Sequence, residues 1–194
     1  MMTNTQILTL LAISLAPTAL PRATAEDGWF NTQKPGLIQL YEHLHSHPEL
    51  SYHETETARR LAAELREAGA QVTEKVGGTG VVGVLTNGDG PTVLVRSDLD
   101  ALPVTEATGL SYASRVKTEN DAGESVGVMH ACGHDVHMTS LIGTARWLSD
   151  HRDLWKGTVV FVGQPAEERI GGAKAMLADG LYERFPKPDY ALAL

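Results

Sequence analysis

Two neighbouring stretches of the chain carry apolar residues at helical spacing. Residues 36–50 form the first stretch, which ends at Pro48. The second begins with Ser51 and Glu54, and this spacing predicts a capping box in which Ser51 is the N-cap. The two apolar stripes consist of Leu37, Leu40, Tyr41, Leu44, Ala58, Leu61, Ala62 and Leu65. The pattern therefore predicts two consecutive helices, the second ending at Gly69.

The next segments have the composition of strands. Residues 70–76, 78–88 and 91–104 are rich in β-branched side chains and are separated by glycine-containing turns. Residues 107–127 are polar and show no clear period, which predicts a loop with one short strand.

Helical and strand patterns alternate in the last third of the chain. Residues 136–150 predict an amphipathic helix, and the nearly unbroken apolar run 157–165 predicts a strand that is covered on both faces. A short helix over 172–177 and a strand over 189–194 follow. This order predicts an α/β fold with a mixed, largely parallel sheet flanked by helices.

The N-terminus has the pattern of a secretory signal peptide. The apolar stretch Ile7–Leu20 is too short to span a membrane, and it is followed by the small-residue site Ala23-Thr24-Ala25. Pro17 and Pro21 argue against a buried helix here. We therefore expect residues 1–25 to be removed on export to the periplasm or the exterior, leaving residues 26–194 as one domain.

The net charge and the cysteine content of the chain argue against several kinds of function and of covalent cross-link. The formal net charge of −8 argues against a nucleic-acid-binding surface and a polybasic lipid-binding surface. We expect no stable membrane span beyond the leader. Cys132 is the single cysteine, so the chain cannot form an internal disulfide, and the thiol needs another explanation.

Three polar clusters lie where the sites of α/β sheets gather, at the carboxyl ends of strands and in the loops that lead into helices. Asp98 and Asp100 follow an apolar run at a spacing of two, so both carboxylates are expected to face one crevice. The alternative is an aspartate-rich turn before Pro103. Glu167 and Glu168 follow the apolar strand 157–165. Such a pair is often only surface charge, but one carboxylate can bind a metal while the other activates water.

The remaining cluster is the segment MHACGHDVHM. Cys132 and His134 stand two apart in a glycine-containing loop before a helix, a spacing that lets a thiolate and an imidazole bind one cation. We interpret His130 and His137 as residues that do not bind the metal, either supporting the ligands or simply solvated. An isolated cysteine is more often a small buried apolar side chain.

Together the three clusters indicate a catalytic metal site of the zinc type. Cys132, His134 and Glu168 would be the protein ligands, with one coordination position left open for water. The main rival is nucleophilic catalysis by Cys132, with His130 or His134 as base, which leaves the glutamate pair unused.

Several motifs occur in the order found in one enzyme family: LHSHPELSYHETETA, GGTGVVGVL, RSDLDALPVTE, MHACGHDVHM, GTVVFVGQPAEE and GGAKAMLADGL. From residue 36 onward, the chain resembles the amidohydrolase branch of the aminoacylase/carboxypeptidase-like zinc peptidases, which includes hippurate hydrolase, N-acyl-amino-acid amidohydrolases and plant auxin-conjugate hydrolases.

The resemblance implies hydrolysis of N-acyl-amino acids with one or two divalent ions of zinc, manganese, cobalt or nickel. It implies that Glu167 is the general base, that Asp100 orients a metal ligand, and that Asp98 stands where related peptidases have a histidine ligand. The implied metal ligands are Cys132, His134 and Glu168.

The resemblance also implies a longer protein. Family members carry two further histidine ligands and a lid or dimerisation domain, so we expect this chain to be the N-terminal part of a catalytic domain, with exposed apolar edges and little activity alone. Any homodimer is expected to form through the absent domain. Two alternatives stay open, a dipeptidase or carboxypeptidase of the same wider family and a non-catalytic remnant that binds metal or a partner.

Overall fold

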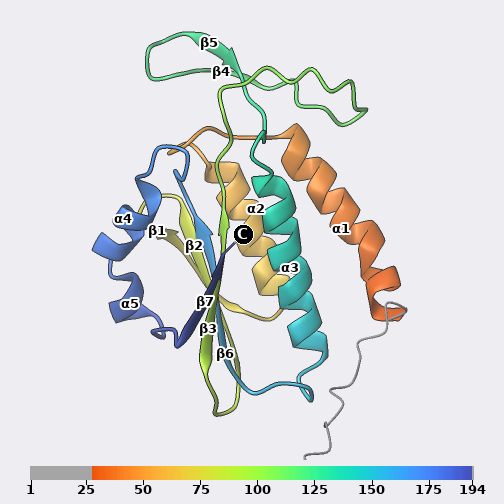
Figure 1. Cartoon of the computed structure of the whole chain (residues 1–194), viewed down its shortest axis with the longest axis vertical. Helices are drawn as coiled ribbons and strands as arrows, with labels where there is room; N and C mark the ends of the chain where they lie inside the picture. Colours follow the sequence, from red (N-terminus) through yellow and green to blue (C-terminus); the bar gives the residue numbers. More distant parts are fainter. Residues whose placement is uncertain (1–27, 194) are drawn as a thin grey trace, which may run out of the picture.

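A five-stranded sheet lies between two layers of helices (Figure 1). The computed structural model describes residues 28–193, so the predicted signal peptide lies outside the described residues. The helices are α1 (Gly28–Ser46), α2 (Thr55–Glu67), α3 (His134–Asp150), α4 (Gly172–Ala178) and α5 (Leu181–Arg184). The strands are β1 (Gln71–Val76), β2 (Gly80–Asn87), β3 (Thr92–Asp98), β4 (Lys117–Glu119), β5 (Ser125–Gly127), β6 (Gly157–Gln164) and β7 (Tyr190–Ala193).

The sheet is mixed, with strand order β1-β2-β6-β3-β7. β3 pairs in parallel with both β6 and β7, whereas β2 runs antiparallel to β1 and to β6. Because helices connect β3 to β6 and β6 to β7, these three strands point the same way, as the alternating pattern predicted. The predicted α/β class with a mixed sheet flanked by helices is confirmed.

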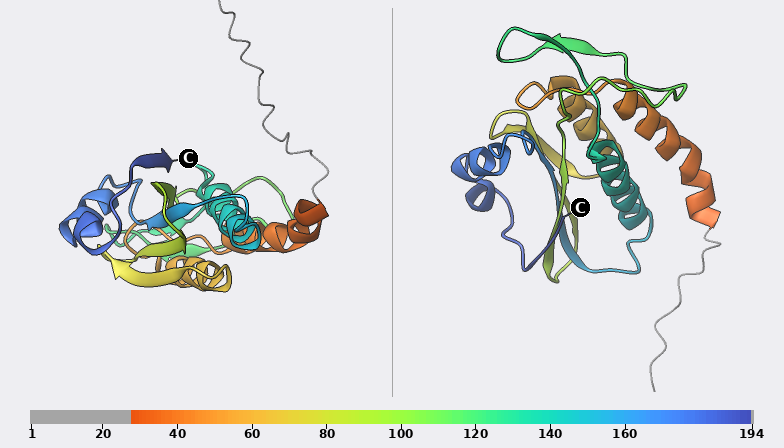
Figure 2. Two further views of the ribbon diagram at one scale, coloured as in Figure 1. Left: turned by 90° about the horizontal axis from the view of Figure 1, so that it is seen from below. Right: turned by 45° about the horizontal axis from the view of Figure 1, so that its top comes forward.

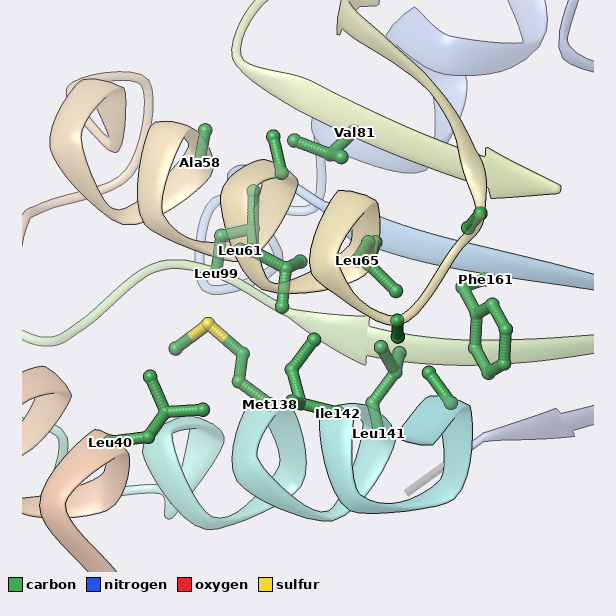
Figure 3. Close-up of a cluster of buried hydrophobic side chains, with 14 of the residues drawn as sticks. Leu40, Ala58, Leu61, Leu65, Val81, Leu99, Met138, Leu141, Ile142 and Phe161 are labelled. Carbon is green, nitrogen blue, oxygen red and sulfur yellow. The ribbon is translucent and has the colours of Figure 1, made fainter. Parts of the chain in front are cut away.

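The two faces of the sheet have separate apolar cores. Phe161 of β6 packs with the side chains of α2 and α3 on one face (Figure 3). Val160 and Val162 point to the opposite face and pack with Met176 of α4 and Leu181 of α5. Figure 2 shows these helices on both sides of the sheet. The prediction that the apolar run 157–165 is covered on both faces is therefore confirmed.

The predicted capping box at the second helix is wrong. The helix begins at Thr55 with Glu54 as its N-cap, and the Ser51 hydroxyl donates a hydrogen bond of 2.6 Å to Asp100 Oδ2. The carboxylate of Glu49 accepts hydrogen bonds from the backbone N–H groups of Glu56 and Thr57 instead. An acidic side chain from the preceding loop thus satisfies free N–H groups of the first turn, which releases Ser51 for a long-range contact.

Other boundaries also differ from the prediction. Helix α1 begins eight residues earlier than expected and includes Pro35, and α3 begins at His134 rather than at residue 136. The polar segment 107–127 contains a two-stranded hairpin, β4–β5, rather than one strand. Strand β7 lies at the edge of the sheet with Tyr190 and Leu192 exposed, in agreement with the expected apolar edge.

Among residues 28–193, no helix combines the length and the apolar character needed to cross a bilayer.

Candidate metal centre

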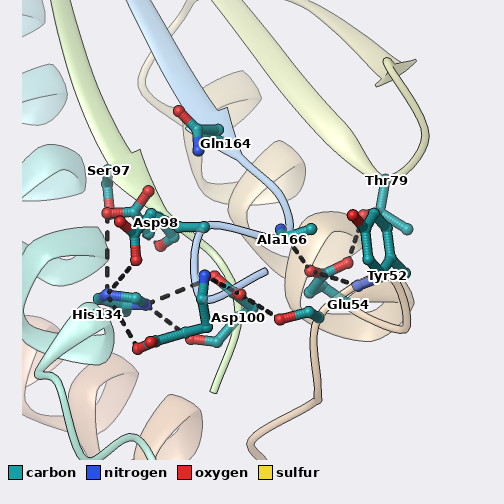
Figure 4. A network of polar contacts seen from close by, with 12 residues as sticks. Tyr52, Glu54, Thr79, Ser97, Asp98, Asp100, His134, Gln164 and Ala166 are labelled. Atoms are coloured by element: carbon teal, nitrogen blue, oxygen red, sulfur yellow. Dashed lines mark hydrogen bonds and ion pairs between the residues drawn. The ribbon is translucent and has the colours of Figure 1, made fainter. Parts of the chain in front are cut away.

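The polar clusters after β3 and β6 meet at the N-terminus of α3. Asp98 ends β3, Asp100 follows it, and His134 is the first residue of α3 (Figure 4). Glu167 and Glu168 lie in the loop that follows the parallel neighbour β6. Parallel strands end at the same edge of a sheet, which brings these segments together although up to 70 residues separate them.

His134 presents one free ring nitrogen to the cluster. Its Nδ1 lies 2.8 Å from the backbone oxygen of Asp100. Because a carbonyl oxygen can only accept a hydrogen bond, Nδ1 carries the proton and donates it. In the neutral imidazole the lone pair then resides on Nε2, which is the nitrogen that a metal ion requires. His134 is also buried, so its orientation is held by the surrounding protein.

Three carboxylates surround this free nitrogen. Nε2 lies 3.8 Å from an Asp98 oxygen, and 3.9 Å from an oxygen of each of Glu167 and Glu168. These distances are too long for hydrogen bonds. Two ligands of one tetrahedral zinc ion lie about 3.3 to 3.6 Å apart, so the atoms are close to the separation at which they would share a cation.

The unpaired polar atoms of the site also fit a divalent ion. Among the described residues, Oε1 of Glu168, Nδ1 of His137 and Oδ1 of Asp100 are buried without a hydrogen-bond partner. A buried polar atom without a partner is unfavourable, and carboxylate oxygens and neutral imidazoles are ordinary ligands of zinc, manganese, cobalt and nickel. The residues present therefore fit such an ion.

Two groups of three side chains place their ligand atoms within 4.8 Å of one another. One contains His134, Glu167 and Glu168, and the other contains Asp98, His134 and His137. This proximity differs from the expectation that His137 does not bind the metal. The available signal was its position on α3, because residues three apart in a helix lie on the same face.

Cys132 and His130 lie near these groups but outside both. Cys132 is exposed. A hydrogen bond with Glu168, together with some loss of solvent around the sulfur, raises the pKa of its thiol to about 11. Burial lowers the pKa of His130 to about 4. Neither ring nitrogen of His130 has a hydrogen-bond partner among the described residues. The metal-ligand role of Cys132 and the supporting role of His130 stay predictions.

Asp100 connects the segments of the site. Its Oδ2 accepts hydrogen bonds from the Ser51 hydroxyl at 2.6 Å and from the backbone N–H of Glu168 at 3.0 Å. Its backbone oxygen accepts the proton of His134 Nδ1. Asp100 therefore orients two predicted ligands, which is the arrangement expected for a residue that supports a metal centre.

Asp98 is held between a cation and the carboxylate cluster. Arg96 forms an ion pair with its Oδ1, whereas its Oδ2 faces His134. Burial raises the pKa of Asp98 to about 6, although Arg96 and His134 act in the opposite direction.

A second buried network, which the sequence did not predict, lies next to the site. His45 of α1 lies 2.7 Å from Asp135 and 3.1 Å from Glu106, each contact using a different ring nitrogen. Asp135 directly follows His134, so this network ties α1 and the loop after β3 to the start of α3. Its three members are 29 or more residues apart in the chain, and no local pattern connects them.

The His45 network predicts a pH-dependent contribution to stability. Burial alone would lower the pKa of His45, but hydrogen bonds with Glu106 and Asp135 raise it above its ordinary value of 6.5. The charged form is therefore favoured by folding. The contribution of protonated His45 to the free energy of unfolding is present in full below pH 6.5 and is lost as the pH rises through the folded-state pKa.

We expect the difference in unfolding free energy between the wild type and His45→Gln to decrease on going from about pH 6 to about pH 8.5. Urea unfolding at several pH values would measure it. A difference that stays constant, or that grows with pH, would contradict the assignment of a raised pKa to His45.

Several known proteins are similar to this chain in sequence. Hippurate hydrolase of Campylobacter jejuni is 45% identical over 148 residues, which is 76% of this chain and 36% of that protein. Thermostable carboxypeptidase 1 of Saccharolobus solfataricus is 44% identical over 149 residues, covering 75% and 36% of the two chains. The chain thus spans about a third of the length of these relatives.

A solved structure supports the fold independently. The Bacillus subtilis YXEP protein, described as a dinuclear metal-binding peptidase from the M20 family, superposes with a TM-score of 0.68 at 41% identity. The match covers 81% of this chain and 41% of that one. The model of peptidase family M20/M25/M40 matches residues 94–194, which include Asp98, His134 and the glutamate pair. Because this match extends over more than half of the chain, the protein belongs to peptidase family M20/M25/M40.

Proposed function

We propose that the full-length protein is a metal-dependent amidohydrolase that cleaves the amide bond of N-acyl-amino acids. The observation that carries the proposal is the free Nε2 of His134, which faces carboxylate oxygens of Asp98, Glu167 and Glu168 at 3.8 to 3.9 Å. The hippurate hydrolase among the relatives supports an acyl-amino acid as the substrate class.

In this proposal Cys132, His134 and Glu168 hold one or two divalent ions of zinc, manganese, cobalt or nickel. When bound, the ion supplies Lewis acidity, which polarises the scissile carbonyl and makes a nearby water more acidic. Asp100 keeps the ligand set in place through the Nδ1–H of His134 and the backbone N–H of Glu168. Asp98 and His130 support the site without a direct catalytic task.

Glu167 is the general base of the proposed reaction. Its side chain is 41% exposed, in contrast to 18% for Glu168, while its Oε2 stays 3.9 Å from His134 Nε2. Glu167 therefore borders both the ligand cluster and solvent. Its carboxylate removes a proton from the attacking water and later delivers that proton to the nitrogen of the departing amino acid.

The test is an assay of the full-length protein, loaded separately with each of the four metals. We expect hydrolysis of N-benzoylglycine to exceed hydrolysis of a dipeptide, and chelation to abolish both. A preference for the dipeptide would favour the peptidase alternative, which the carboxypeptidase among the relatives supports. Bound metal without hydrolysis across a broad panel of acyl groups would favour a non-catalytic binding protein.

The substrate in this proposal is a small molecule, and any homodimer forms through residues beyond this chain. Export is a further proposal that rests on the sequence of residues 1–25 alone.

A further inference from the structure

Glu54 is a fully buried carboxylate that lies outside the ligand cluster. Its exposed fraction is 0%, and Figure 4 shows it on the far side of Asp100 from His134. Oε1 accepts hydrogen bonds of 2.8 Å from the backbone N–H groups of Tyr52 and Ala166. Oε2 accepts one of 2.6 Å from the Thr79 hydroxyl. Glu54 therefore joins the start of α2, the turn before β2 and the loop that follows β6.

Both residues that donate to Oε1 have an unusual backbone conformation. Tyr52 has a φ of 70° and Ala166 has a φ of 46°. A residue with a Cβ atom is disfavoured in this left-handed region and stays there only when surrounding contacts enforce it. The hydrogen bonds to Glu54 are such contacts, because each fixes the direction in which the N–H group points.

Ala166 is held on both sides of its α-carbon. Glu54 accepts its N–H, while its carbonyl oxygen accepts the backbone N–H groups of Gly171 at 3.1 Å and Gly172 at 3.3 Å. Ala166 is also completely buried. The next residue is Glu167, so the conformation of Ala166 sets the direction in which the chain enters the glutamate pair.

We infer that Glu54 is a positioning residue for Glu167, acting through the backbone of Ala166. This inference rests on the proposed function, in which Glu167 is the general base. The Glu54 carboxylate keeps Ala166 in its left-handed conformation and thereby keeps the Glu167 carboxylate beside His134. Glu54 itself does not reach the ligand cluster, whose atoms come from the other side of Asp100.

The test compares three substitutions in the metal-loaded, full-length protein. Glu54→Leu removes every acceptor, and we expect it to lower kcat about 10- to 100-fold with little change in KM, the range seen for residues that support a metal site. Glu54→Gln keeps one oxygen for the two N–H groups and should retain most of kcat. Glu54→Asp keeps the charge, but its side chain is one methylene shorter. It should resemble Glu54→Leu, because the carboxylate must extend far enough to accept the two N–H groups and its charge alone does not suffice.

A matched control is Glu64→Leu. Glu64 is another buried glutamate, located on α2, and within residues 28–193 its carboxylate forms hydrogen bonds with the side chains of Arg60 and Arg146. Its replacement should reduce thermal stability while leaving kcat within about twofold of the wild type. Bound metal, measured by elemental analysis, should stay equal in the Glu54 and Glu64 variants, because none of these substitutions removes a ligand. If Glu54→Leu does not fold, the comparison of Glu54→Asp with Glu54→Gln decides.

Wild-type kcat in both Glu54→Leu and Glu54→Asp would overturn the inference, as would an equal loss of kcat in Glu64→Leu. Loss of bound metal in the Glu54 variants would also overturn it, because it would place the effect on the ligands rather than on Glu167. A wild-type protein without hydrolytic activity would instead overturn the proposed function and this inference together.

Discussion

Replacement of Glu167 by Gln is expected to lower kcat about 10²- to 10⁴-fold, the contribution of a positioned general base. Gln has nearly the same size and can still form hydrogen bonds, but it cannot take a proton from water. Because the Glu167 side chain is 41% exposed, we expect the substitution to leave the fold intact. It should also leave metal binding nearly unchanged, since the proposed ligands are Cys132, His134 and Glu168.

The measurement is steady-state hydrolysis of N-benzoylglycine by the full-length protein, together with its metal content. Glu183→Gln is a suitable control, since Glu183 is an exposed residue of α5, on the opposite face of the sheet from α3. Retention of wild-type kcat in Glu167→Gln would remove the general base from the mechanism. The rival mechanism, in which Cys132 is the nucleophile, would then require a test with Cys132→Ala.

Replacement of His134 by Ala is expected to weaken metal binding by more than about 100-fold, because even the loss of a residue that only supports a ligand weakens binding 10- to 100-fold. His134 contributes the free Nε2 and is the one residue common to both groups of candidate ligands. Its loss also leaves the carboxylates of Asp98, Glu167 and Glu168 without the central imidazole. Hydrolysis should be lost with the metal.

Equilibrium dialysis with elemental analysis would measure this loss, with His47→Ala as the control. His47 is an exposed histidine directly after α1 that belongs to neither candidate group. A parallel Cys132→Ala variant tests the proposed thiolate ligand. Unchanged metal content in His134→Ala would contradict the site itself, whereas unchanged content in Cys132→Ala alone would contradict only the role of the cysteine.

Two predictions that depend on neighbouring residues in the chain agree with the structure. Successive side chains of a strand point to opposite faces of the sheet, so an unbroken apolar run predicts burial on both faces. The run in β6 can be recognised from its eight consecutive residues alone. The alternation of strand and helix patterns along the chain likewise predicted that β3, β6 and β7 are parallel, because a helix connects each strand to the next.

Predictions that depend on distant partners were less complete. Ser51 has the spacing of an N-cap, but its hydroxyl binds Asp100, which is 49 residues away. His137 could have been recognised from its helical spacing to His134, whereas its proximity to Asp98 required the fold. The hydrogen bond between Glu54 and Ala166 joins residues that are 112 positions apart, and no pattern in either segment predicts it.

The sequence by itself therefore determined the class of the fold, the family and the segments that carry the candidate chemistry, because all three are recorded in local patterns and motifs. Only the tertiary structure decided which oxygen and nitrogen atoms meet. The His134 tautomer, the three carboxylates around its free nitrogen and the support of Ala166 by Glu54 arise from strand pairing and helix packing. These bring distant segments within a few ångströms, and their hydrogen bonds then select the side-chain orientations.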